Sequence, residues 1–172
     1  MANKNWTDDE PLDSPKRRRL PPLLRRCWYS LNQAFRRRLA HTGITPDQFT
    51  ILRILLEHEP EGLTQFELAT QMSSDPNTVS SLLRRMTEAS LVRRKRDEAD
   101  RRAMQVRITA AGERIYHEAR KLALDLQGAL LEKIPEARRE QFLIDLDLVA
   151  EAATEQAKKG KDEAEDEPES GA

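Results

Sequence analysis

Short polar side chains and arginines share the segment 75–88 with regularly spaced apolar residues. Ser, Thr and Asn are short enough for a helix backbone to enter the DNA major groove, and with arginine they can hydrogen-bond base edges and phosphates. The apolar residues Val79, Leu82, Leu83 and Met86 recur at helical spacing and predict the buried side of that helix. The other side supplies the candidate DNA contacts, which are Asn77, Thr78, Ser80, Ser81, Arg84 and Arg85.

A second cationic cluster follows between residues 91 and 109. Met104, Val106 and Ile108 alternate with polar residues, which predicts a half-buried strand, and Leu91 and Val92 open its partner. Residues 96–102 would connect the two strands as a hairpin. Acids near the tip can hold arginine side chains in one orientation, and an ordered arginine suits the negative potential of a narrow minor groove. The candidate contacts on this hairpin are Arg94, Arg96, Asp100, Arg101 and Arg102.

Helix N-cap residues predict where the helices that carry these clusters begin. Thr45, Thr64 and Asp75 each stand at an expected helix N-cap, and the first two begin capping boxes with the Gln or Glu three residues later. Short helices joined by a tight turn, the second carrying the polar–basic face, predict a helix-turn-helix. The basic hairpin directly after it makes a winged helix over residues 45–108.

Long amphipathic segments flank this domain, at residues 21–42 and 110–157, and Pro135 interrupts the second. An apolar stripe of this length cannot be buried on so small a domain, so we expect it to pack against a second copy of the chain. The expected fold is therefore mainly α with a small β-hairpin wing, and residues 21–157 form one unit. Residues 1–20 are expected to be a flexible basic arm and residues 158–172 a disordered acidic tail.

Composition excludes several classes of protein. The chain has 172 residues, 38% hydrophobic and 34% charged, and its net charge of −1 averages strongly separated basic and acidic segments. The single cysteine, Cys27, excludes an internal disulfide and a cysteine-rich zinc site. The three histidines, His41, His58 and His117, lack metal-ligand spacing, so we expect no metal and no cofactor. Neither a membrane span nor a secretory signal is evident, and we expect a cytoplasmic protein.

The segment LTQFELATQMSSDPNTVSSLLRRMTEASLVRRKRDEADRRAMQVRITAAGERIY, residues 63–116, resembles the MarR family of bacterial winged-helix regulators. The sequence TPDQFTILRILLE before it extends the resemblance, which covers about residues 22–157 by pattern. The family implies a homodimer on a pseudo-palindromic DNA operator, usually a repressor, released by a small anionic or phenolic ligand or by cysteine oxidation. Its D-x-R wing motif matches Asp100-Arg101-Arg102, so Arg102 would enter the minor groove and Asp100 would orient it. The family commonly has glycine where this chain has Ser90.

Two candidate regulatory sites each have two interpretations. Trp28, Tyr29 and Phe49 could line a pocket for an anionic aromatic ligand, or they could be packing residues of a dimer core. Cys27 lies beside Arg25 and Arg26, which would favour a thiolate, but it also falls on the apolar stripe of its helix. Each residue therefore has both a sensing and a packing interpretation.

Two other classes of function compete with a DNA-binding regulator. A helical dimeric adaptor could use a winged helix to bind protein, but its docking face should then be apolar and not polar and basic. An enzyme would need a motif such as a Gly-rich phosphate loop, a nucleophile elbow or paired catalytic carboxylates in an apolar setting, and the sequence shows none of these. We therefore expect a non-enzymatic regulator whose partner is double-stranded DNA.

Overall fold

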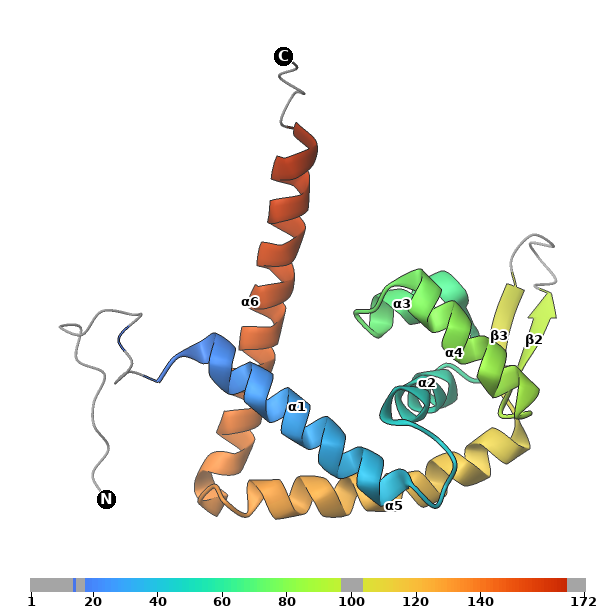
Figure 1. The fold of residues 1–172 in the computed structure, drawn as a ribbon, viewed down its shortest axis with the longest axis horizontal. Coiled ribbons are helices and arrows are strands. Elements are labelled where there is room, and N and C mark those ends of the chain that lie inside the picture. The colour runs from blue at the N-terminus through green and yellow to red at the C-terminus, as the bar shows by residue number, and fades with distance from the viewer. Residues whose placement is uncertain (1–13, 15–17, 97–103, 167–172) are drawn as a thin grey trace. The chain divides into compact units, whose positions relative to one another are not determined.

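The computed structural model describes residue 14, residues 18–96 and residues 104–166 (Figure 1). Side chains are described for these residues except 96, 158 and 160–166. The chain divides into two units, Met1–Leu126 and Gln127–Ala172.

Three capped helices form the centre of the first unit: α2 (Pro46–Glu57), α3 (Gln65–Gln71) and α4 (Pro76–Glu88). Both predicted capping boxes are confirmed. The Thr45 hydroxyl accepts the Gln48 N–H at 3.3 Å, and the Gln48 side chain accepts the Thr45 N–H at 2.9 Å. Thr64 and Glu67 repeat the arrangement, and the Thr64 backbone N–H lowers the pKa of Glu67. These local bonds set where each short helix begins.

A small antiparallel sheet completes the winged helix. It has the order β1-β3-β2, with β1 at Leu63–Thr64, β2 at Val92–Arg96 and β3 at Met104–Ile108. The predicted hairpin is confirmed in β2 and β3, whose register pairs Val92 with Ile108 and Arg94 with Val106. The pairing of β1 with β3 was not expected from the sequence. The fold is therefore mainly helical with a three-stranded sheet, which confirms the predicted class.

The core of the first unit lies between the helices and one face of this sheet. Its fully buried side chains are apolar and come from α2, α3, α4 and the sheet, and they include Leu52, Leu55, Leu68, Leu83, Met86, Val92 and Val106. Helices α1 (Leu20–Leu39) and α5 (Ala110–Leu131) join it through an aromatic chain. Phe49 of α2 stacks on Tyr116 of α5 and meets the edge of Phe35 of α1, with centroids 5.4 and 5.1 Å apart. Buried residues of α4 and of the wing strands belong to the same core cluster as those of α2 and α5.

The second unit contains the 3₁₀ helix η1 (Glu136–Arg138) and the long helix α6 (Arg139–Asp166). The Arg139 Nε donates to the carbonyls of Leu131 and Ile134 at 3.0 and 3.1 Å, which closes the turn around Pro135. Large apolar side chains on α6 are exposed, namely Phe142, Leu143, Ile144, Leu146 and Leu148.

Helix α6 extends further than the sequence suggested. We expected a disordered tail from residue 158, but the helix continues to Asp166. The added residues are mostly Ala, Glu, Asp and Lys, and the Ala, Glu and Lys among them have high helix propensity, so the backbone can stay helical without an apolar face. The expectation for residues 167–172 lies outside the described residues, as does that for most of residues 1–20. Across the described part of the chain, no helix is both long enough and apolar enough to cross a membrane.

Candidate nucleic-acid interface

Asp75 caps the N-terminus of α4. One carboxylate oxygen of Asp75 accepts the backbone N–H groups of Asn77 and Thr78, both at 2.9 Å, and the Thr78 hydroxyl donates to the other oxygen. These bonds, the Thr78 hydroxyl first, lower the pKa of Asp75 below its ordinary value. The cap confirms the predicted start of the helix and leaves its positive dipole end at the surface.

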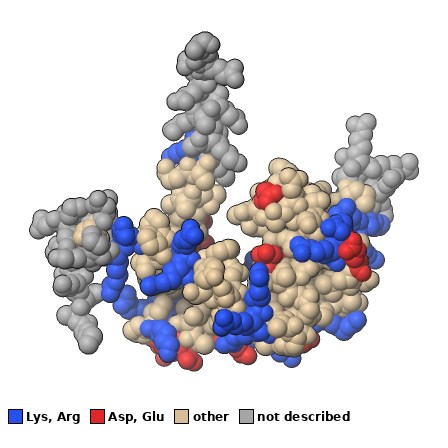
Figure 2. All heavy atoms as spheres, in the orientation of Figure 1, with Lys and Arg blue, Asp and Glu red and all other residues tan. Residues whose placement is uncertain are grey.

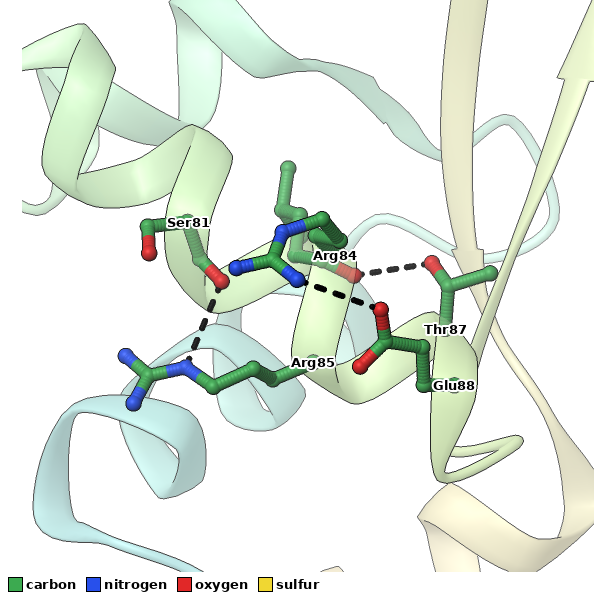
Figure 3. A network of polar contacts seen from close by, with 6 residues as sticks. Ser81, Arg84, Arg85, Thr87 and Glu88 are labelled. Carbon is green, nitrogen blue, oxygen red and sulfur yellow. Dashed lines mark hydrogen bonds and ion pairs between the residues drawn. The ribbon is translucent and has the colours of Figure 1, made fainter.

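Helix α4 separates apolar and polar side chains as its spacing predicted. Val79, Leu82, Leu83 and Met86 are buried, whereas the candidate contacts are exposed, apart from a half-buried Ser80. Figure 3 shows how the two arginines are arranged on the exposed side. Arg84 reaches Glu88 at 3.3 Å, and the Arg85 Nε donates to the Ser81 carbonyl at 3.4 Å. Exposed ion pairs of this kind are weak, so Arg84 can exchange Glu88 for a phosphate or a base.

The exposed side of α4 and the wing enclose an open groove of about 560 Å³. Its lining joins four of the candidate contacts on α4 to Arg94 of β2, and comprises Asn77, Ser80, Ser81, Arg84, Thr87, Glu88 and Arg94. In Figure 1 α4 runs beside the β2–β3 hairpin, and in Figure 2 basic side chains gather over the same region. Hydroxyl, amide and guanidinium groups thus converge on a single surface.

Thr87 and Glu88 are lining residues that the sequence interpretation missed. The helical period could have found them, because Glu88 lies one turn beyond Arg84, and Thr87 lies two turns beyond Ser80. The Thr87 hydroxyl donates to the Leu83 carbonyl at 2.8 Å, so this side chain is already bonded to its own helix. Glu88 supplies a negative charge to the groove and pairs with Arg84 at 3.3 Å.

The wing contacts are only partly covered by the described residues. Arg94 is exposed and lines the groove. Arg96 ends β2, where its backbone pairs with Met104, but its side chain lies outside the described residues. Asp100, Arg101 and Arg102 also lie outside them, so their assigned roles at the wing tip stay predictions.

The turn from α4 into β2 depends on Ser90. Its φ of 58° lies in the left-handed region, which glycine adopts most easily. This conformation agrees with the glycine that the MarR family commonly has at this position. The Leu91 N–H returns to the Met86 carbonyl at 2.9 Å, and the Thr109 hydroxyl donates to the Ser90 carbonyl at 2.7 Å. These bonds fix the angle between α4 and the wing.

The candidate ligand and redox residues lie in different surroundings. Phe49 is half-buried in the aromatic chain with Phe35 and Tyr116, whereas Trp28 and Tyr29 are 66% and 59% exposed on α1. Cys27 is exposed and not part of the core of the single chain. The proposed pocket and the redox role both stay predictions.

Two of the three histidines contact other polar groups of the chain. His58 bonds the Ile54 carbonyl through Nδ1 at 2.8 Å, and His41 lies 3.4 Å from Glu118. The described residues contain no group of three His, Cys, Asp or Glu side chains that could hold a metal ion.

The fold and the groove define a winged helix-turn-helix domain. Residues 44–104 of this domain match the model of the MarR family, so this part of the chain is similar to MarR-family winged helices. It is 33% identical over 84 residues to the HTH-type transcriptional regulator TtmR of Methylorubrum extorquens, over 49% of this chain and 42% of that protein. It is 32% identical over 90 residues to the HTH-type transcriptional regulator MgrA of Staphylococcus aureus, over 52% of this chain and 57% of that protein. The chain thus spans about half the length of these curated relatives.

Solved structures cover more of the chain. A MarR-family transcriptional regulator from Rhodococcus sp. RHA1 is 27% identical with a TM-score of 0.68, over 74% of this chain and 89% of that one. CouR from Rhodococcus jostii RHA1, bound to p-coumaroyl-CoA, is 28% identical with a TM-score of 0.67, over the same shares of 74% and 89%. The S. aureus MepR–DNA complex has a TM-score of 0.73 at 24% identity, over 79% and 99% of the two chains, and supports the fold alone.

Proposed function

We propose that this protein is a sequence-specific DNA-binding transcriptional regulator that acts as a homodimer. The observation that carries the proposal is the groove in which the polar face of α4 meets Arg94 of the wing. In such a domain α4 is the recognition helix and enters the major groove, while the wing follows the backbone towards the minor groove.

The side chains of the groove divide into two kinds of contact. Asn77, Ser81 and Arg84 project from the exposed side of α4, where amide, hydroxyl and guanidinium groups can read base edges. Arg94 suits phosphates, because an exposed guanidinium can donate hydrogen bonds to phosphate oxygens. The relative CouR has been solved bound to a 23-mer DNA duplex, at 26% identity and a TM-score of 0.69, which supports this mode of binding.

The homodimer is supported by apolar surface that the single chain leaves exposed. Leu143 and Leu146 on α6 are 38% and 40% exposed, and Leu24 and Trp28 on α1 are 37% and 66% exposed. Burying such side chains stabilises association, by about 25 cal/mol for each Å² removed from water. Two copies would place two recognition helices on half-sites about one helical turn apart.

We propose that a small anionic aromatic molecule releases the DNA. The relative CouR was solved with p-coumaroyl-CoA. Trp28 and Tyr29 offer exposed aromatic surface on α1, close to Arg25 and Arg26 in the sequence, and Phe49 is a half-buried aromatic of α2. Oxidation of Cys27 is the alternative release mechanism, and its exposure makes the thiol accessible to an oxidant. An adaptor role is less well supported, because the groove is lined by polar and charged residues.

The first test is enrichment of genomic fragments by the purified protein, followed by sequencing. We expect the enriched sites to share an inverted repeat whose half-sites lie about 10 base pairs apart, centre to centre. Ser81→Ala and Arg84→Ala should alter the preferred bases, whereas Arg53→Ala on α2 serves as the charge-removing control. If the wild-type protein enriches no sequence above bulk DNA, the proposed function is wrong.

A further inference from the structure

The side of the wing opposite the groove carries two arginines directly across from each other. The antiparallel register of β2 and β3 pairs Arg93 with Arg107. Side chains alternate between the two faces of a strand, so Arg93 lies on the face opposite Arg94, which lines the groove. The hairpin therefore presents cationic side chains on both of its faces.

Arg107 is held in place by the loop before β1. Its Nε donates to the Glu61 carbonyl at 3.0 Å. The neighbouring Gly62 leaves room for its stem, because a Cβ at Gly62 would lie 2.7 Å from the Arg107 Cγ. Its φ of 77° is a further reason for glycine at this position. With Nε engaged, the terminal nitrogens of the guanidinium keep N–H groups for an anion.

This arrangement has a cost for the folded chain. Like charges directly opposite each other on neighbouring strands destabilise the pair. Among the described residues, the ion pairs are His41–Glu118, Arg53–Glu57 and Arg84–Glu88, and none of them includes Arg93 or Arg107. Two facing guanidinium groups of this kind fit an external anion that would neutralise both.

We propose that Arg93 and Arg107 form a second DNA-backbone contact, on the side of the wing away from the groove. A hairpin laid along a duplex lies between two rows of phosphates, because a sugar–phosphate backbone borders each side of a DNA groove. Arg94 and α4 face one row, and the Arg93–Arg107 pair contacts the other. This inference rests on the proposed function, since it extends the contact surface of the same complex.

The test is the salt dependence of binding to a labelled, non-specific 30-base-pair duplex, measured by fluorescence anisotropy of the full chain. Each phosphate contact contributes about 0.9 to the slope of log affinity against log salt. In the proposed homodimer the Arg93→Gln/Arg107→Gln double variant removes two contacts from each wing, so it should lower the slope by about 3.6, which is roughly a 150-fold smaller loss of affinity between 50 and 200 mM salt. Arg120→Gln on the exposed side of α5 removes one charge elsewhere and should change the slope little.

A second readout separates binding from folding. Arg93→Gln should unfold at the same temperature as the wild type or higher, because it relieves a repulsion, while its DNA affinity falls. Arg107→Lys should retain most of the salt slope, because it keeps the charge but loses the bond to Glu61. A lower unfolding temperature for Arg93→Gln would mean that the residue supports the fold, and would overturn the inference.

The outcomes also separate this inference from the proposed function. If the wild-type chain binds DNA and the double variant binds with the same slope, the second contact is absent and the proposed function stands. If the wild-type chain binds no DNA at any salt concentration, both proposals fail.

Discussion

Gly112 lies against the backbone carbonyl of Leu91, with no room between them for a side chain. A Cβ at Gly112 would overlap the Leu91 oxygen and would lie 2.9 Å from Ile108 Cγ1. The Gly112 N–H also donates to the Thr109 hydroxyl at 3.0 Å, and the Thr109 backbone N–H donates to the Leu91 carbonyl at 3.1 Å. The first turn of α5 is thus locked onto the start of the wing.

Gly112→Ala should therefore destabilise the winged helix. Because the nearest neighbour is backbone, which cannot rotate away, we expect a loss of about 2 kcal/mol or more in the free energy of unfolding. Gly128→Ala is the matched control in the same helix, since nothing lies within 4 Å of a Cβ there. It should stabilise the chain by up to about 1 kcal/mol. Urea titrations of both variants measure the difference, and an equal effect at the two positions would contradict this packing.

Ser90→Gly should stabilise the turn that joins α4 to β2. At a φ of 58° a serine is strained relative to glycine, so we expect a gain of about 1 kcal/mol in the free energy of unfolding. Ser90→Ala keeps the Cβ and should show no such gain. Thermal unfolding of the two variants at one protein concentration provides the comparison. A loss of stability for Ser90→Gly would mean that its hydroxyl matters more than its backbone conformation.

The Asp75 cap should make α4 sensitive to acid. The pKa of Asp75 is lower in the folded chain than in the unfolded chain, because Thr78 and the helix N–H groups bond its carboxylate. Its stabilising contribution is therefore complete above the unfolded pKa, about 3.9, and is lost as pH falls through the lower folded value. The difference in unfolding temperature between the wild type and Asp75→Ala should be constant near neutral pH and shrink below about pH 4. If the difference in unfolding temperature instead grew below about pH 4, the ionised Asp75 carboxylate would not be the stabilising form of the cap.

Arg102→Ala should weaken operator binding without unfolding the protein. The D-x-R pattern assigns this side chain to the minor groove, where a narrow, negative groove attracts arginine. We expect a loss of about 1–3 kcal/mol in operator affinity, measured by anisotropy on an enriched site, with an unchanged circular dichroism spectrum. Lys133→Ala, in the second unit, is a charge-removing control. Unchanged affinity for Arg102→Ala would remove the residue from the interface.

Charges on the apolar face of α6 should separate the dimer. Leu143→Glu and Leu146→Glu would place carboxylates where we propose that a second copy packs, and buried charges without partners are costly. Sedimentation velocity should show a shift from dimer to monomer, or a sharp loss of soluble protein. Glu140→Gln, an exposed position at the start of α6, should leave the dimer intact. A wild-type chain that sediments as a monomer would refute the proposed assembly.

Much of the winged helix was predictable because its determinants are local. The N-caps at Thr45, Thr64 and Asp75 bond backbone groups two or three residues away, so residue type and spacing suffice to place the helix starts. The helical period of α4 likewise predicted which side chains are buried and which are exposed. The end of α6 was predicted too early, at residue 157, because the prediction relied on an apolar stripe. Residues with high helix propensity continue the helix to Asp166 without such a stripe.

The sequence by itself determined the order of elements and the polar face of α4, since caps and periodicity act over a few residues. Only the tertiary structure decided that β1 pairs with β3, that Arg94 shares a groove with α4, and that Arg93 lies opposite Arg107. These relationships join residues that are distant along the chain, and they depend on strand register. A shift of one residue in that register would move every wing side chain to the other face, so the register decides which arginines meet the groove.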